Sequence, residues 1–234
     1  MARSRLLVVA FLIITLGIAA AAFRTNSVSD SHPGSVTSAA PMLQPRSGQT
    51  ATLLPDGKVL IAGGMRQNQD FYKSAELYDP ATGKCNPTGE MNVARVGHVG
   101  VLLQTGKVLI AGGWVGGGGT DSAEFYDPAT GKFTLVAKMT IRRGRPSATM
   151  LTDGDVLIAG GEERDNQSLA SAEIFRVKTL SFQRIASMHH ARVSHTATLL
   201  NDGRVLIAGG YAGTFQQARN YMIPKPVRSW KPVA

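Results

Sequence analysis

The chain has 234 residues, of which 43% are hydrophobic and 18% charged, and 26 are glycines. This composition excludes a disordered, charge-rich polypeptide and favours one ordered domain with many tight turns. The formal net charge of +9 comes from basic residues scattered singly along the chain, so we expect no nucleic-acid partner. Cys85 is the only cysteine, so stability must come from packing rather than from an internal disulfide.

The first 22 residues differ in kind from the rest. Arg3 and Arg5 precede an uncharged apolar stretch, residues 6–22, that ends in three alanines. This pattern predicts a signal peptide and a secreted or periplasmic protein. An uncleaved membrane anchor formed by residues 6–22 remains the alternative, because the stretch is near the lower length limit for a spanning helix, and only then do we expect membrane contact. Residues 23–35 are predicted to be a polar linker.

Residues 36–234 repeat themselves in four units, predicted at about 43–91, 92–139, 140–188 and 189–234. Three markers recur at the same spacings of 49, 48 and 49 residues: a double glycine, a methionine, and an arginine four residues after the methionine. In chain order, the glycine pairs begin at Gly63, Gly112, Gly160 and Gly209, the methionines are Met42, Met91, Met139 and Met188, and the arginines are Arg46, Arg95, Arg143 and Arg192.

Each unit is predicted to contain four short strands. In the first unit, residues 50–54 form a strand that an Asp-Gly turn joins to a second, and glycine supplies the backbone angles of a tight hairpin. The second strand, residues 59–62, is an unbroken apolar run, which predicts burial on both faces. A variable loop leads to a third strand, residues 74–78, and an Asp-Pro-Ala-Thr-Gly turn leads to the fourth. Four antiparallel strands per unit, stacked around an axis, predict propeller blades.

Two segments of the sequence resemble the kelch repeat. Residues 192–210 follow the pattern Arg-x-x-His-x-x-x-Leu-Leu-x-Asp-Gly-x-Val-Leu-Ile-Ala-Gly-Gly, and residues 122–131 read Ser-Ala-Glu-x-Tyr-Asp-Pro-x-Thr-Gly. The resemblance implies an all-β fold, a β-propeller of four kelch-type four-stranded blades. Members of that family usually have more blades than this chain has units, and only the first three units carry the complete pattern.

The predicted blades can form either a closed small ring or a partial propeller. Residues 35–42 align with residues 132–139, so an N-terminal strand would complete the last blade and close a four-bladed ring, with residues 229–234 as a weaker candidate for its fourth strand. An open stack would instead leave apolar faces on its end blades. Such a stack would pair with a second copy as a homodimer, or be a truncated product.

Residues that recur in every unit are expected to serve the fold. The glutamates Glu76, Glu124 and Glu173 are predicted to pair with the recurring arginines or with backbone amides. His98 and His195 share one repeat position and are expected to bond to neighbours. The adjacent pair His189 and His190 lacks the spacing typical of a zinc site, so neither a metal nor another cofactor is expected.

A binding site is predicted where the units differ, in the loops between their second and third strands. These loops, residues 65–73, 114–121, 162–170 and 211–217, carry aromatic and charged residues that would share one rim with the recurring arginines, unless they merely connect strands. Together with Phe71, the candidate ligand-binding residues are Arg66, Tyr72, Trp114, Glu162, Arg164, Asp165, Tyr211, Arg95, Arg143, His189, His190 and Arg192.

The predicted function is that of an exported, non-catalytic module that binds a protein or carbohydrate ligand through these loops. One alternative is a metal-dependent oxidase resembling galactose oxidase, although Cys85 aligns with the core phenylalanines Phe133 and Phe182 rather than with the crosslinked cysteine of those enzymes. The other alternative is a truncated propeller remnant without independent function. No catalytic residue is predicted, and the sequence contains no Gly-x-Ser-x-Gly segment of a serine hydrolase.

Overall fold

The computed structural model describes residues 38–67, 70–164, 167–212 and 221–224. The chain divides into two compact units, residues 1–38 and 39–234, and every strand of the described residues lies in the second. Within the described ranges, all regular elements are strands, and no helix long and apolar enough to cross a membrane occurs there. The predicted signal peptide or anchor and the linker lie outside the described residues.

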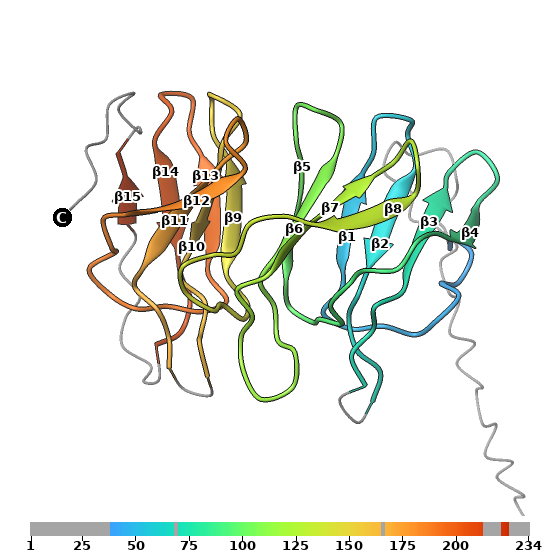
Figure 1. Ribbon diagram of the computed structural model, residues 1–234, viewed down its shortest axis with the longest axis horizontal. Helices are drawn as coiled ribbons and strands as arrows, with labels where there is room; N and C mark the ends of the chain where they lie inside the picture. Colours follow the sequence, from blue (N-terminus) through green and yellow to red (C-terminus); the bar gives the residue numbers. More distant parts are fainter. Residues whose placement is uncertain (1–37, 68–69, 165–166, 213–220, 225–234) are drawn as a thin grey trace, which may run out of the picture. The chain divides into compact units, whose positions relative to one another are not determined.

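The strands form four antiparallel sheets in chain order, which are the blades of a β-propeller, as predicted (Figure 1). The first three blades have four strands, and the described part of the last has three. Blade 1 contains β1 (Thr50–Leu53), β2 (Val59–Ala62), β3 (Ala75–Asp79) and β4 (Lys84–Pro87); blade 2 contains β5 (Val99–Leu102), β6 (Val108–Ala111), β7 (Ala123–Asp127) and β8 (Lys132–Leu135); blade 3 contains β9 (Ser147–Met150), β10 (Val156–Ala159), β11 (Ala172–Arg176) and β12 (Ser181–Ile185); blade 4 contains β13 (Thr196–Leu199), β14 (Val205–Ala208) and β15 (Tyr221–Ile223).

Tight turns join the strands at the positions where the sequence places glycine. Between β1 and β2, the Gly57 N–H donates to Leu54 O (3.0 Å), and the φ angle of Gly57 is 84°, a value that favours glycine. Between β3 and β4, the Gly83 N–H donates to Asp79 O (2.8 Å) while the Asp79 carboxylate accepts from the Ala81 N–H (2.9 Å). Aspartate and glycine therefore have the turn roles that the sequence predicts.

Apolar side chains pack between successive blades rather than within a single one. In β6, Val108 and Ile110 pack against blade 1, whereas Leu109 and Ala111 pack against blade 3. A blade with neighbours on both sides must bury alternate side chains on opposite faces, because successive residues of a strand point to opposite faces. The unbroken apolar run thus has the predicted two-sided burial in blades 2 and 3, where all four residues of β6 and β10 are buried.

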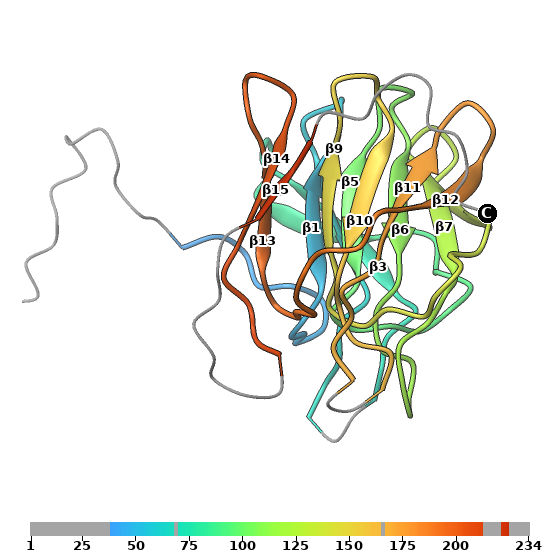
Figure 2. The same cartoon turned by 90° about the vertical axis from the view of Figure 1, so that its left-hand side faces the viewer.

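Three apolar clusters among the described residues join blade 1 to 2, blade 2 to 3 and blade 3 to 4. The inner strands β1, β5, β9 and β13 likewise contact one another in chain order, and Figure 2 looks onto the blades from the side of blade 4. Of the N-terminal segment proposed to complete the last blade, residues 35–37 lie outside the described residues, and residues 38–42 form no strand. Residues 229–234, the weaker candidate, also lie outside.

Backbone contacts at the double glycines hold the blades together. The second glycine donates its N–H to the carbonyl of the recurring arginine in the next blade: Gly64 to Arg95 (2.9 Å), Gly113 to Arg143 (2.7 Å) and Gly161 to Arg192 (2.9 Å). The first glycine leaves room for the same carbonyl, since a Cβ on Gly63 would lie 2.7 Å from Arg95 O. We call this set of contacts, with the apolar side chains beside it, the seam between two blades.

Candidate functional site

The recurring arginines are buried inside the blades, where they hold strand ends together. Nη1 of Arg95 donates to Gly112 O (2.7 Å) and Ser122 O (3.0 Å), and Nη2 donates to the Glu124 carboxylate (2.8 Å). Both side chains of this ion pair are fully buried. Burial lowers the pKa of Arg95, and the charge of Glu124 partly offsets that effect.

The same ion pair recurs in blades 1 and 3, as Arg46 with Glu76 (2.8 Å) and Arg143 with Glu173 (2.9 Å). In every case the glutamate also accepts a backbone N–H from the residue after the recurring methionine, as Glu124 does from Asn92 (2.7 Å). The predicted pairing of glutamates with arginines is therefore confirmed. The same pairs correct the predicted binding site. Arg95 and Arg143 were candidate ligand-binding residues, but their side chains are buried and fully engaged within their blades.

Arg192 of blade 4 is buried in the same way, and its Nη1 donates to Gly209 O (2.5 Å). The sequence predicts Arg95, Arg143 and Arg192 at the rim because of their repeat position. In the structure their side chains turn into the blade. A guanidinium without contact to solvent cannot meet a ligand without unfolding the strand ends that it bridges.

The two histidines at the shared repeat position tie inner strands of neighbouring blades. Nε2 of His98 lies 3.0 Å from Thr50 Oγ1, and Nε2 of His195 lies 2.8 Å from Ser147 Oγ. Burial lowers the pKa of His98 to about 3 and that of His195 to about 4, helped by the charges of Arg95 and Arg192. Both imidazoles are therefore neutral near pH 7. In the described ranges, no three potential metal-ligating side chains gather in one place.

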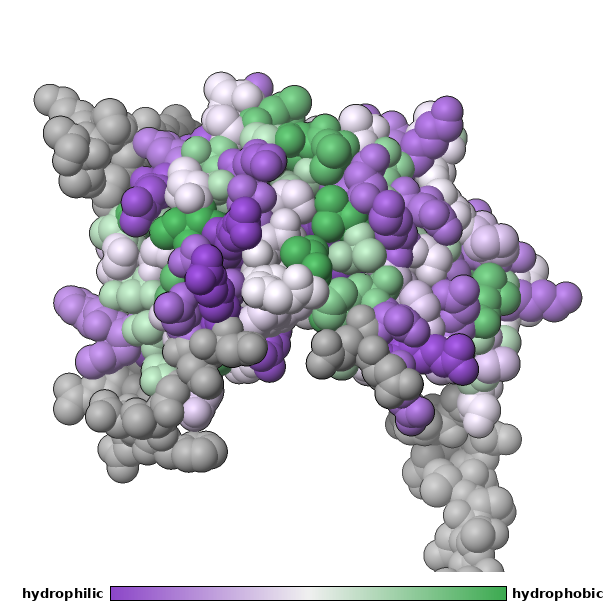
Figure 3. All heavy atoms as spheres, turned by 60° about the horizontal axis from the view of Figure 1, so that its bottom comes forward, coloured by the Kyte–Doolittle hydropathy of each residue, from purple (hydrophilic) through white to green (hydrophobic). Residues whose placement is uncertain are grey.

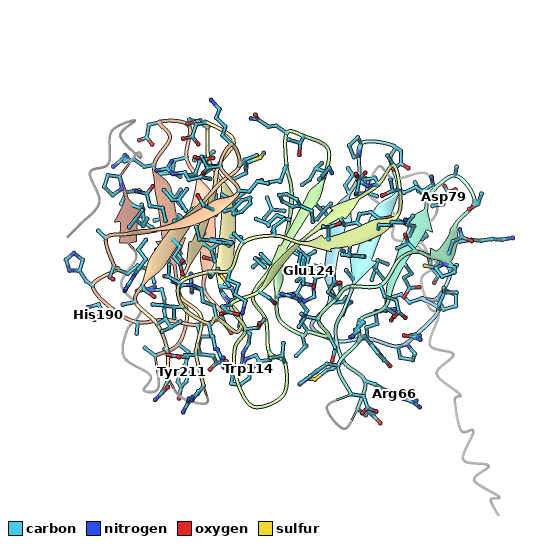
Figure 4. The ribbon with its side chains drawn as sticks, viewed as in Figure 1. Arg66, Asp79, Trp114, Glu124, His190 and Tyr211 are labelled. Atoms are coloured by element: carbon cyan, nitrogen blue, oxygen red, sulfur yellow. The ribbon has the colours of Figure 1, made fainter. Side chains whose placement is uncertain are left out.

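The variable loops emerge at one end of the blades. Figure 4 shows Arg66, Trp114 and Tyr211 along the same edge, opposite the turn that contains Asp79. Figure 3 brings this end forward, and hydrophobic residues form a band across it with hydrophilic residues on both sides. The loops thus share one face, as the sequence predicts for connections between second and third strands.

A cleft of about 460 Å³ opens on this face between the loops of blades 1 and 2. Aromatic, apolar and glycine residues line most of it, and one arginine reaches it from the opening segment of blade 3. The lining residues are Gly48, Met65, Phe71, Val96, Gly97, Trp114, Gly116, Gly117 and Arg145.

A buried carboxylate fixes the two largest polar groups of the cleft. Oε1 of Glu162 accepts the indole N–H of Trp114 (3.1 Å) and the Nε–H of Arg145 (2.6 Å). The Arg145 guanidinium also lies over the Trp114 ring, 6.0 Å from its centroid. The Glu162 side chain is only 6% exposed while that of Arg145 is 52% exposed, so the carboxylate supports the cleft from beneath and the guanidinium faces solvent.

The backbone of Arg145 is strained in a way that brings its side chain to the cleft. Its φ angle is 49°, and the equivalent residues Gly48, Gly97 and Ser194 also have positive values of 66°, 61° and 55°. This repeat position therefore requires the left-handed region, which costs a non-glycine residue about 1 kcal/mol or more. Sequence reasoning missed Arg145, although an arginine where two other units have glycine was a detectable signal.

Of the predicted rim residues, Phe71 and Trp114 line the cleft, and Glu162 bonds to Trp114 beneath it. Tyr72 instead lies beneath Arg46, whose guanidinium is 5.1 Å from the ring centroid. Arg66 and Arg164 are exposed on their loops, and Asp165 lies outside the described residues.

The remaining candidates lie away from the cleft. Tyr211 is 38% exposed and its backbone is bonded to Val193 (2.9 Å). His189 and His190 are exposed beyond β12, and His189 borders a separate cavity of about 220 Å³ between blades 3 and 4.

Comparisons with known proteins agree with this architecture. The model of the Kelch motif family matches residues 95–140, which span the second repeat. The solved structure of YjhT has a similar fold, with a TM-score of 0.63 and 16% sequence identity over 71% of this chain. This chain covers 59% of the YjhT chain. No curated protein matches the sequence. The chain therefore folds as a β-propeller, and its second repeat matches the Kelch motif.

Proposed function

We propose that this propeller is an exported, non-catalytic module that binds a carbohydrate in the cleft of Phe71, Trp114 and Arg145. The observation that carries the proposal is the cleft itself, formed by two loops that differ between repeats and by an arginine held in a strained backbone conformation. Strain of this kind persists where the surrounding structure maintains it, and it is concentrated at binding sites.

The lining of the cleft suits a sugar ring. Aromatic faces pack against the apolar C–H faces of a pyranose, and a guanidinium offers N–H donors to its hydroxyl or carboxylate oxygens. The cleft volume of about 460 Å³ is in the range of small-ligand pockets. Because Glu162 already accepts bonds from Trp114 and Arg145, its role in the proposal is to position these two side chains rather than to react.

Export is part of the proposal and rests on the basic and apolar N-terminal pattern of residues 1–22. A carbohydrate on a cell surface or in the periplasm is then an accessible ligand. The oxidase alternative gains no support from residue placement, because no group of three potential ligands was found within the described ranges.

A glycan array with the wild-type chain, followed by calorimetry on the best binder, tests the proposal. Trp114→Ala and Arg145→Gly are each expected to weaken binding about tenfold or more, because each removes a central contact. Leu135→Ala, which changes an exposed apolar residue on the outer strand β8, is the control and should bind as the wild type does.

Two results would contradict the proposal. One is the absence of binding to any glycan, and the other is binding that both cleft variants leave unchanged. A protein ligand whose binding depends on Trp114 and Arg145 in the same way would replace the carbohydrate as the partner of the cleft.

A further inference from the structure

The two end blades carry apolar faces that are only partly covered. The second strands of all four blades have the same sequence, Val-Leu-Ile-Ala, and in blades 2 and 3 every residue of it is buried. In blade 1, Val59 and Ile61 are half-buried, and in blade 4, Leu206 and Ala208 are half-buried. Figure 1 shows that these blades stand at opposite ends of the row.

The two partly covered faces are complementary in kind. At each internal seam, the Val and Ile side chains of one blade pack on the Leu and Ala side chains of the blade before it, as Val205 and Ile207 pack on Leu157 and Ala159. Blade 1 presents Val and Ile outward, and blade 4 presents Leu and Ala outward. The end faces are therefore the two halves of one more seam.

The backbone of blade 4 also carries the glycine pair that a further seam requires. A Cβ on Gly63, Gly112 or Gly160 would lie within 2.8 Å of the next blade, whereas a Cβ on Gly209 would meet no atom of the described residues within 4 Å. Gly210 is exposed, although Gly161 at the same repeat position is buried.

The backbone of blade 1 presents the matching acceptor. The Arg46 side chain is only 2% exposed, yet Arg46 as a whole residue is half-buried, so its exposed area lies mainly on the backbone. At internal seams, the carbonyl of this arginine accepts the glycine N–H, and there Arg95 and Arg143 are completely buried.

We propose that a second copy of this chain docks head to tail, with blade 4 of one copy on blade 1 of the other. The Gly210 N–H donates to the carbonyl of Arg46 in the second copy, while Leu206 and Ala208 cover Val59 and Ile61. Thr196 extends the match, because it occupies the position from which Thr50 and Ser147 bond the next blade, and Gln49 occupies the position of the bonding histidines. The contact is heterologous, so two copies offer a second identical seam.

A second copy is favoured over the chain's own opposite end, because the structure leaves both end faces partly exposed while it packs blades 1 to 4 in chain order. It is favoured over an unrelated partner, because the repeat already supplies both halves of the contact. Hydrophobic surface that continues an established interface is a typical protein-binding surface.

Light scattering of the full chain over a range of concentrations tests the proposal. The wild type is expected to associate, and Ile61→Glu and Leu206→Glu are each expected to raise the dissociation constant at least tenfold, since each places a charge in a seam. Leu135→Glu is the control: Leu135 is exposed on β8 of blade 2, an internal blade, so this variant should associate like the wild type. Circular dichroism of each variant establishes that it is folded.

Mixing the two seam variants tests the head-to-tail geometry. A copy with Ile61→Glu keeps an intact blade 4, and a copy with Leu206→Glu keeps an intact blade 1, so an equimolar mixture should recover association through one intact seam. The proposal is overturned by a monomeric wild type at every concentration, by association that neither substitution weakens, or by a mixture that recovers nothing. Association through residues outside the described ranges would be weakened by neither substitution, and would therefore overturn the proposal.

Discussion

Blades 2 and 4 share the sequence of their second strand and differ in what covers it. In β6 every residue is buried, whereas in β14 burial alternates, with Leu206 and Ala208 half-exposed. The glycine pairs that follow show the same contrast, because Gly113 is buried and bonded to Arg143 while Gly210 is exposed. Identical local sequence therefore produces identical strands, but the neighbouring blade decides how much of each strand is removed from water.

The largest expected effect comes from breaking the buried ion pair of blade 2. Arg95→Met leaves the Glu124 carboxylate buried without its counter-charge, and the free energy of unfolding should fall by about 3–5 kcal/mol in a urea titration. Lys107→Met in the same blade is the matched control, because the Lys107–Asp127 pair is exposed to solvent. Equal losses in the two variants would show that burial does not distinguish these pairs.

A pair of glycine variants compares an internal seam with an end blade. The φ angles of Gly160 and Gly209 are 61° and 70°, so Ala costs each about 1–2 kcal/mol in backbone strain. Gly160→Ala also forces a Cβ to 2.6 Å from Arg192 O, while Gly209→Ala meets no neighbour among the described residues. We expect a clearly larger loss of thermal stability for Gly160→Ala. Equal melting temperatures in dilute solution would mean that the internal seam contributes no steric restriction.

The smallest expected effect near neutral pH involves His98, which instead changes the acid sensitivity of the seam between blades 1 and 2. The pKa of His98 is about 3 in the folded protein and near its ordinary 6.5 in the unfolded chain. The unfolded chain therefore binds a proton that the folded protein does not, and stability is lost as pH falls from about 6.5 toward 3. His98→Gln keeps a polar group near Thr50 and should lose less stability over that interval.

Urea titrations at several pH values measure this difference. His190→Gln is the control, since it removes an exposed histidine away from the seam between blades 1 and 2. A wild type and a His98→Gln variant with parallel pH profiles would contradict the assignment of a neutral, buried imidazole.

Most of the fold could be predicted because its signals are local and repeated. The Asp-Gly turn, the run Val59 to Ala62 and the double glycine recur at one spacing, and each has a direct physical reading as hairpin, buried strand and close backbone contact. The Arg–Glu pairs were predictable for the same reason, since a residue needed by every blade appears in every blade.

The candidate site was predicted only in part. Trp114 and Glu162 were selected because their loops differ, but their hydrogen bond crosses from blade 2 to blade 3. Arg145 was missed because its repeat position, rather than its residue type, marks it as unusual. Arg95 and Arg143 were placed at the rim because spacing along the chain does not reveal whether a side chain turns into a blade or away from it.

The sequence by itself determined the strands, the turns, the four-fold repeat and the residues that every blade requires, because these depend on interactions within about fifty residues of chain. Only the tertiary structure decided which faces of identical strands are covered and which loop residues meet in one cleft. The physical reason is that burial and side-chain contact depend on the neighbouring blade, and the number and placement of neighbours is not encoded in any single repeat.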